Sequence, residues 1–192
     1  MPGTPSLDAT FLSEKFEAAL DWDAYLATDT DRATRWREVL DRTALTAAQQ
    51  ALLAGFSREM HVLVLSGIWC GDCIQQGPML ERIARGSPRI RLRYLDRDEH
   101  ADLSNLVRLN GGQRVPTVLL LAEDFELAGL YGDRTLSRYR ALGARTLGPA
   151  CPMPTPLPPD EAATTLEEWL DEFERCQWML RLSARLRHRH GD

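Results

Sequence analysis

The chain has 192 residues, of which 44% are hydrophobic, and its formal net charge is −5. A chain of this length and hydrophobic content can bury a core, so we expect one domain with extensions rather than overall disorder. Basic residues are spread along the chain and form no broad basic face, which argues against binding to nucleic acid.

The apolar runs are too short for a membrane. The longest, such as residues 62–65 and 118–122, fall far below the roughly 20 residues that a spanning helix needs. Charged residues interrupt residues 1–20, which argues against a signal peptide. We therefore expect a cytoplasmic protein without membrane partners. In that compartment the four cysteines are kept reduced and serve catalysis, metal binding or the core.

Apolar residues recur at helical spacing in three stretches of the N-terminal part, residues 11–20, 36–40 and 45–53. Thr46 and Gln49 have the spacing of a capping box at the start of the third. We expect residues 1–58 to form a helical extension that packs on the central domain.

Residues 59–147 alternate strand and helix patterns. The strands are predicted at residues 61–66, 90–96, 118–121 and 126–131, and the helices at residues 73–85, 98–109 and 134–142. Residues 61–66 form a continuous apolar run, as a buried parallel strand does. Pro78 should bend or break its helix, because it has no amide hydrogen and crowds the preceding turn. The order predicts an α/β fold with a mixed sheet flanked by helices.

The C-terminal part begins with six prolines within residues 148–159, which predict a stiff extended linker. Residues 160–192 then read as one long helix capped by Asp160. We interpret its basic end, with His188 and His190, as a solvated tail.

Two cysteines stand where the first central strand meets the next helix, in the sequence Trp69-Cys70-Gly71-Asp72-Cys73. A helix start presents unpaired amides and the positive end of the helix dipole, so the pKa of the Cys70 thiol should fall below its free value of about 8.5. Cys70 is then the nucleophile. Cys73, one turn further on, can attack a mixed disulfide on Cys70 and release the reduced substrate.

The same pair could instead be half of a structural zinc site. Such a site needs four ligands, and His61, His100, Cys151 and Cys176 form no second paired motif. We therefore expect no metal, and we interpret Cys151 and Cys176 as core or surface thiols.

The motif at residues 69–73, the later Val115-Pro116-Thr117 and the order of elements resemble the thioredoxin superfamily over residues 61–142. The Trp-Cys-Gly-Asp-Cys form and the N-terminal helices are similar to a bacterial branch of thioredoxin-like proteins. The resemblance implies that the peptide bond before Pro116 is cis, that Pro116 faces the dithiol, and that the Val115 carbonyl pairs with substrate backbone. Trp69 would line the same groove, and Gly71 and Asp72 would tune the acidity of Cys70.

Two residues depart from thioredoxin. Asp72 replaces a proline, and its charge should oppose the Cys70 thiolate, so we expect a reducing or near-neutral potential. Val64 replaces a buried acid that accepts the proton of the resolving thiol. Asp72 itself, Asp96 or water would relay that proton instead.

We therefore expect a thiol-disulfide oxidoreductase that needs no cofactor. Its substrates would be disulfide-containing proteins or small thiol compounds, and a reductase or low-molecular-weight thiol would donate the electrons. The alternative is a thioredoxin-fold binding or redox-sensing module whose dithiol does not turn over.

Overall fold

A four-stranded mixed sheet forms the centre of the protein, for which a computed structural model describes residues 6–148 and 157–192. In spatial order β2-β1-β3-β4, the strands are β2 (Ile90–Asp96), β1 (Met60–Ser66), β3 (Thr117–Ala122) and β4 (Leu127–Gly132). β1 runs parallel to β2, and β3 runs antiparallel to both β1 and β4. β1 is buried at every position. The predicted mixed sheet and its buried first strand are confirmed.

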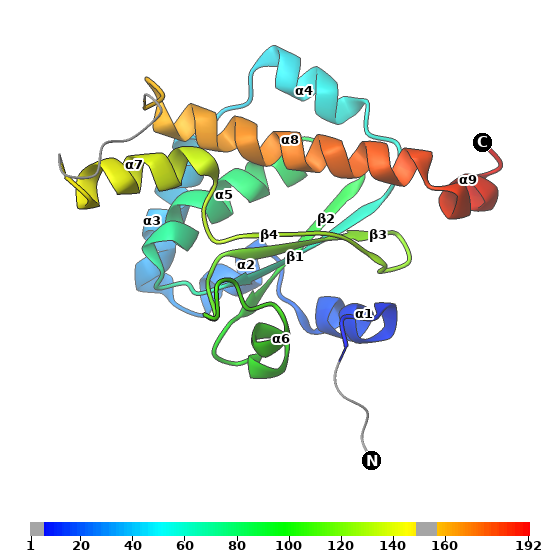
Figure 1. Cartoon of the computed structure of the whole chain (residues 1–192), viewed down its shortest axis with the longest axis horizontal. Helices are drawn as coiled ribbons and strands as arrows, with labels where there is room; N and C mark the ends of the chain where they lie inside the picture. Colours follow the sequence, from blue (N-terminus) through cyan, green and yellow to red (C-terminus); the bar gives the residue numbers. More distant parts are fainter. Residues whose placement is uncertain (1–5, 149–156) are drawn as a thin grey trace.

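Helices cover both faces of this sheet (Figure 1). They are α1 (Ala9–Ala18), α2 (Trp22–Ala27), α3 (Thr30–Arg42), α4 (Ala47–Ala54), α5 (Gly71–Arg85), α6 (Ala101–Leu106), α7 (Leu136–Thr146), α8 (Glu161–Leu182) and α9 (Ala184–His190). Figure 1 shows α5 and α8 on one side of the sheet and α1 and α6 on the other. The predicted α/β class, with helices added at both ends, is confirmed.

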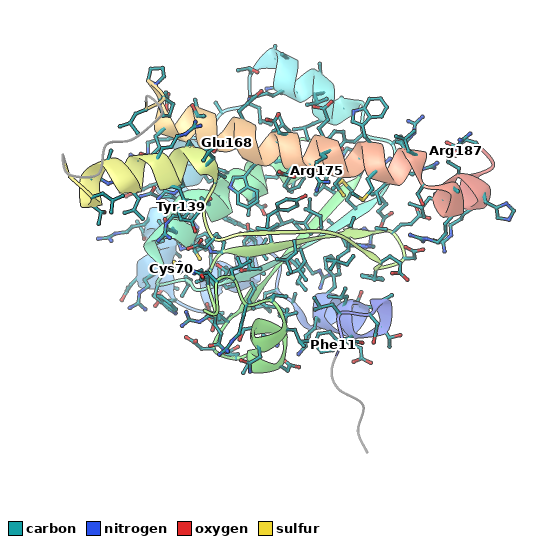
Figure 2. The ribbon with its side chains drawn as sticks, viewed as in Figure 1. Phe11, Cys70, Tyr139, Glu168, Arg175 and Arg187 are labelled. Atoms are coloured by element: carbon teal, nitrogen blue, oxygen red, sulfur yellow. The ribbon has the colours of Figure 1, made fainter. Side chains whose placement is uncertain are left out.

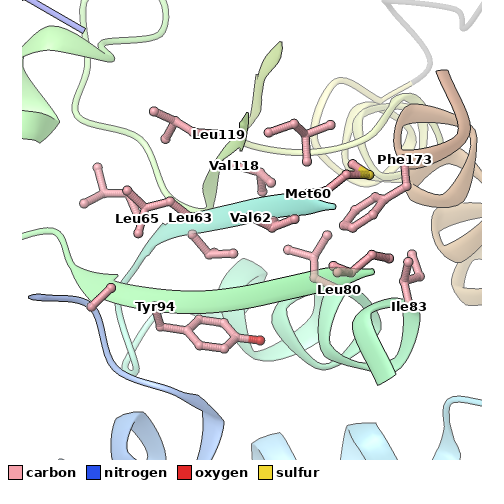
Figure 3. Close-up of a cluster of buried hydrophobic side chains, with 14 of the residues drawn as sticks. Met60, Val62, Leu63, Leu65, Leu80, Ile83, Tyr94, Val118, Leu119 and Phe173 are labelled. Carbon is pink, nitrogen blue, oxygen red and sulfur yellow. The ribbon is translucent and has the colours of Figure 1, made fainter. Parts of the chain in front are cut away.

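The core lies between the sheet and helices α5 and α8. Figure 3 shows Leu80 and Ile83 of α5 and Phe173 of α8 around Met60 and Val62 of β1, and all five side chains are fully buried. Burial of a side chain of this size contributes about 1.5–3 kcal/mol. This packing fixes α5, and with it the start of the helix that carries the cysteine pair.

Within residues 6–59 the structure has four helices, whereas the sequence predicted three helical stretches before the first strand. The missed helix is α2, whose start is capped by the Asp21 side chain accepting a hydrogen bond of 2.9 Å from the Ala24 amide. This helix has only six residues, which is too short for a helical period to show in the sequence. The capping box of Thr46 and Gln49 is present, with reciprocal hydrogen bonds of 3.2 and 2.9 Å.

The sequence predicted that Pro78 would bend or break its helix. The helix is not broken, because α5 runs as one helix from Gly71 to Arg85. Pro78 is itself buried, and α5 packs against α3, α8 and β2. This tertiary packing compensates for the one hydrogen bond that proline removes.

Two other helix predictions need correction. The helix predicted over residues 98–109 spans only Ala101–Leu106, because a turn precedes it and Leu109 pairs with Gly112 in a tight bridge after it. The single C-terminal helix is divided at Ser183 into α8 and α9. Most of the predicted linker, with Cys151, lies outside the described residues.

The C-terminal tail is exposed to solvent, as predicted, and several of its basic side chains pair with acidic residues of the hairpin. Arg189 and His190 bind the two carboxylate oxygens of Glu123 at 3.0 and 2.8 Å, and Arg185 pairs with Asp124. Glu123 and Asp124 lie between β3 and β4. The basic side chains of the tail thus face two acidic residues of the hairpin, an arrangement that the sequence alone did not reveal.

Within residues 6–148 and 157–192, the structure has no helix long and apolar enough to cross a membrane.

Candidate active site

The cysteine pair lies at the carboxyl end of β1, where α5 begins. Cys70 is the N-cap residue of α5, and Cys73 lies in the first turn of the helix. Cys70 is half-buried, and Cys73 is fully buried. Figure 2 shows Cys70 on the same side of the molecule as Tyr139, near the edge of the ribbon. The outer thiol is thus partly exposed to solvent, whereas the inner thiol is enclosed.

The surroundings of Cys70 favour its thiolate. The Cys73 thiol, by hydrogen bonding to Cys70, lowers the pKa of Cys70 to about 6, and the backbone amides of Cys73 and Asp72 act in the same direction. Partial burial and the negative charge of Asp72 oppose this shift. As expected, groups at the helix start lower the pKa of Cys70, and the charge of Asp72 raises it. The hydrogen-bond donors have the larger effect, so the net shift is downward.

Cys73 has the opposite character. Burial raises the pKa of the Cys73 thiol well above its usual value, and the neighbouring Cys70 raises it further. At neutral pH the pair therefore holds one thiolate, on Cys70, and one proton, on Cys73.

The Val115 carbonyl lies beside the outer thiol. The Val115-Pro116 peptide bond is cis, as the resemblance implies. The Cys70 thiol donates a long hydrogen bond to the Val115 carbonyl, with 3.7 Å between the sulfur and the oxygen. Trp69 has 41% of its surface exposed, and the Arg97 guanidinium lies 4.8 Å from the centre of its ring. The structure thus brings the Val115 carbonyl to Cys70 and leaves the neighbouring Trp69 ring partly exposed on the surface.

Two arginines bind the carboxylate of Asp72. Arg134 and Arg138 approach its two oxygens at 2.5 and 2.8 Å, and Arg134 also binds the buried Asp133 at 2.6 Å. The negative charge beside the nucleophile is therefore balanced by cations. Sequence reasoning missed these arginines, because they lie 62 and 66 residues after Asp72 in the chain. Gly71, by contrast, is exposed, and a Cβ there would meet nothing within 4 Å.

Contacts from α8 hold α7, which carries Arg138, in place. The Glu168 carboxylate, labelled in Figure 2, accepts hydrogen bonds of 2.9 and 2.7 Å from the amide and hydroxyl of Ser137 at the start of α7. The Trp169 indole donates to the Gln76 side chain of α5 at 3.1 Å. The C-terminal helix therefore positions groups around the cysteine pair.

Of the residues considered as zinc ligands, Cys151 lies outside the described residues, and the other three have surroundings of their own. His61 stacks on Phe125 with ring centres 4.3 Å apart, and His100 approaches the Lys15 amine at 3.5 Å. Cys176 is buried in the apolar face of α8, where burial raises its pKa to about 12. In the part of the chain that the structure describes, no three His, Cys, Asp or Glu side chains are grouped to hold a metal ion.

The sequence model of the thioredoxin family, described simply as thioredoxin, matches residues 19–139, which is more than half of the chain. The chain belongs to the thioredoxin family. The matched region starts just before α2, so this thioredoxin-family protein shares with its family a stretch that includes α2 and α3 as well as the cysteine pair.

Solved structures show the same fold. A protein of unknown function from Pseudomonas aeruginosa is 24% identical, with a TM-score of 0.64 over 85% of this chain and 95% of that one. An HIV epitope-scaffold is 23% identical, with a TM-score of 0.57 over 86% of this chain and 92% of that one. A search of curated proteins found no match. The likeness to these two solved structures covers more of the chain than the family model matches.

Proposed function

We propose that this thioredoxin-family protein is a thiol-disulfide oxidoreductase in which Cys70 attacks and Cys73 resolves. The observation that carries the proposal is the unequal setting of two thiols within one helical turn. Cys70 is half-buried at the helix start with its pKa lowered to about 6, while Cys73 is fully buried with its pKa raised. A thiolate for attack and a protected thiol for resolution are what dithiol exchange requires.

The reaction has two exchange steps. The Cys70 thiolate attacks one sulfur of a substrate disulfide, and the other substrate sulfur leaves as a thiolate. Cys73 then loses its proton and attacks the Cys70 sulfur, so the Cys70–Cys73 bond forms and the second substrate thiolate leaves. The substrate gains two electrons and the protein loses two, which a reductase or low-molecular-weight thiol returns.

The groove beside Cys70 would bind the substrate backbone. The Val115 carbonyl, now 3.7 Å from the Cys70 thiol, is free to accept a substrate amide once Cys70 is in a mixed disulfide. Pro116 would border this site, and the exposed Trp69 ring offers an apolar contact. Gly71 leaves open space in front of the nucleophile, and Asp72 sets the local charge.

The proposal places the protein in a reducing compartment such as the bacterial cytoplasm, where disulfides of proteins or small thiol compounds are its substrates. Residues 59–147 would form the redox domain. Residues 1–58 would support it as a helical extension, and residues 160–192 would close it after the linker at residues 148–159.

Reduction of insulin disulfides by dithiothreitol, with and without the protein, tests the function. Wild type should accelerate the reduction, and Cys70→Ser should show only the uncatalysed rate. Reduced Cys73→Ser, mixed with insulin after dithiothreitol has been removed, should retain a covalent adduct with the substrate detectable by mass. Cys176→Ser is the matched control, because it removes a buried thiol from α8 outside the site. A wild-type rate equal to the uncatalysed rate would instead favour the binding or redox-sensing module.

A further inference from the structure

Asp133 is a buried carboxylate that the exchange steps described above do not use. It lies between β4 and α7 and is only 4% exposed. A buried charge is costly unless cations or hydrogen-bond donors surround it. Arg134 at 2.6 Å and Arg114 at 3.3 Å bind one oxygen of Asp133, and the Tyr139 hydroxyl donates to the other. Burial alone would raise the pKa of Asp133, but these partners hold it below its usual value, so the carboxylate is ionised at neutral pH.

Arg134 joins Asp133 to Asp72. One terminal nitrogen of its guanidinium lies 2.6 Å from Asp133 Oδ2, and the other lies 2.5 Å from Asp72 Oδ2. A guanidinium can bridge two carboxylates in this way because its nitrogens form a rigid planar fork, whereas a lysine ammonium is a compact point charge. Asp133 therefore fixes the position of a cation that neutralises Asp72, which lies two residues after Cys70.

The backbone of Asp133 is also tied to the elements around the site. Its carbonyl accepts a hydrogen bond of 3.0 Å from the fully buried Gln76 of α5, and the Gln76 side chain accepts one of 3.1 Å from the Trp169 indole of α8. Arg114, the second cation on Asp133, directly precedes Val115, whose carbonyl lies beside the outer thiol. Asp133 is thus anchored to α5, to α8 through Gln76, and to the segment that carries Val115.

We propose that Asp133 is a positioning residue for the Cys70 nucleophile. It holds Arg134 on Asp72 and thereby weakens the opposition of that carboxylate to the neighbouring thiolate. The inference rests on the proposed role of Cys70 in disulfide exchange. Among the described residues no hydrogen bond joins Asp133 to either cysteine, so it acts through its arginine. The charged and titratable groups that bear on Cys70 are Cys73 and Asp72 of α5, Tyr25 of α2, and the two cations on Asp72, Arg134 and Arg138.

A charge effect and a positioning effect of Asp133 have opposite signs. Removal of a negative charge near Cys70 would by itself favour the thiolate and lower its pKa. Loss of the anchor of Arg134 instead leaves Asp72 less neutralised, which raises the pKa of Cys70. Asp133→Asn separates the two effects, because an amide has only one acceptor oxygen and cannot accept from Tyr139 on one side and from the arginines on the other.

Iodoacetamide alkylation of the reduced full-length protein at graded pH, read out as the mass of the Cys70 peptide, tests the inference. Asp133→Asn should move the midpoint of Cys70 alkylation upward by about 0.5–1 pH unit. Arg134→Lys keeps the charge of the bridge but not its planar fork, and it should move the midpoint in the same direction. The matched control is Arg145→Gln, which removes an exposed arginine of α7 whose carboxylate partner is Glu161. It should leave the midpoint unchanged.

The two variants guard against a failure to fold. The Arg134 side chain is partly exposed, so Arg134→Lys tests the bridge even if the buried Asp133→Asn substitution prevents folding. Cys73 and Cys176 are buried and should resist alkylation in every folded variant, so their protection reports the fold in the same experiment.

A midpoint that stays unchanged or falls in either folded variant would overturn the positioning role of Asp133. The alkylation midpoints need no substrate disulfide, so this outcome is independent of insulin reduction. Failure of wild type to accelerate insulin reduction would instead overturn the oxidoreductase function.

Discussion

The indole nitrogen of Trp36 donates a hydrogen bond of 3.1 Å to the carbonyl of Ile68, two residues before Cys70. Trp36 is fully buried in α3, and its ring lies against Gly77 of α5. One side chain of the N-terminal helices therefore contacts both the loop that leads to the nucleophile and the helix that carries the cysteine pair. The extension is part of the support of the site.

Trp36→Phe should lower the free energy of unfolding by about 1–3 kcal/mol, because it leaves the buried Ile68 carbonyl without its donor. Urea denaturation measures the change. The control is Trp178→Phe on α8, where the side chain is 59% exposed, and this variant should stay within about 0.5 kcal/mol of wild type. Equal stability of the two variants would show that the indole hydrogen bond contributes nothing.

Gly77→Ala should also destabilise the protein, because a Cβ at this position would lie 2.2 Å from the Trp36 ring. Overpacking of this kind costs about 1–3 kcal/mol. Gly71→Ala is the matched control on the same helix, since a Cβ there meets nothing within 4 Å. It should be neutral or stabilising by up to about 1 kcal/mol in the same urea experiment, because alanine favours helix. A stable Gly77→Ala variant would contradict the close contact of α3 with α5.

The rate of Cys70 alkylation should rise with pH around a midpoint of about 6, the lowered pKa of this thiol. Because the Cys73 thiol is the largest cause of that shift, Cys73→Ala should move the midpoint to higher pH, whereas Cys176→Ala should not. The folded pKa of Cys70 lies below the unfolded value, so the stability that Cys70 contributes is complete above about pH 8.5 and is lost as the pH falls through about 6. An alkylation midpoint near 8.5 in wild type would contradict the activation of Cys70.

Asp72→Asn should lower the pKa of Cys70 further. The charge of Asp72 raises the pKa of that thiol, and its removal also frees the guanidinium groups of Arg134 and Arg138. At pH 5 the variant should therefore be alkylated faster than wild type. Glu161→Gln removes a different partner of Arg138 and serves as the control. Slower alkylation of Asp72→Asn would show that Asp72 supports the thiolate rather than opposing it.

The sequence could predict the parts of the protein that depend on neighbouring residues. The apolar run of β1, the helix start at Cys70 and the capping box of Thr46 are local patterns, and each is present in the structure. The effect of Pro78 was misjudged because a local rule ignored the burial of α5 on several sides.

The rest of the candidate site joins residues far apart in the chain. Asp72 of α5 meets Arg134 and Arg138, which lie 62 and 66 residues later in the chain. A single sequence carries no signal for such contacts. Asp96 was named from the sequence as one of three possible proton relays, but the sequence offered no link between it and Cys73.

A redox titration of Cys70 and Cys73 tests the central claim most directly. The protein is equilibrated with graded ratios of reduced and oxidised glutathione, the free thiols are alkylated, and the mass of each peptide is measured. We expect one reversible two-electron transition between about −270 mV, as in thioredoxin, and about −180 mV, as in protein disulfide isomerase, because a lowered thiolate pKa stabilises the reduced form. Continued alkylation of both cysteines under fully oxidising conditions would show that they form no disulfide and would contradict the proposed function.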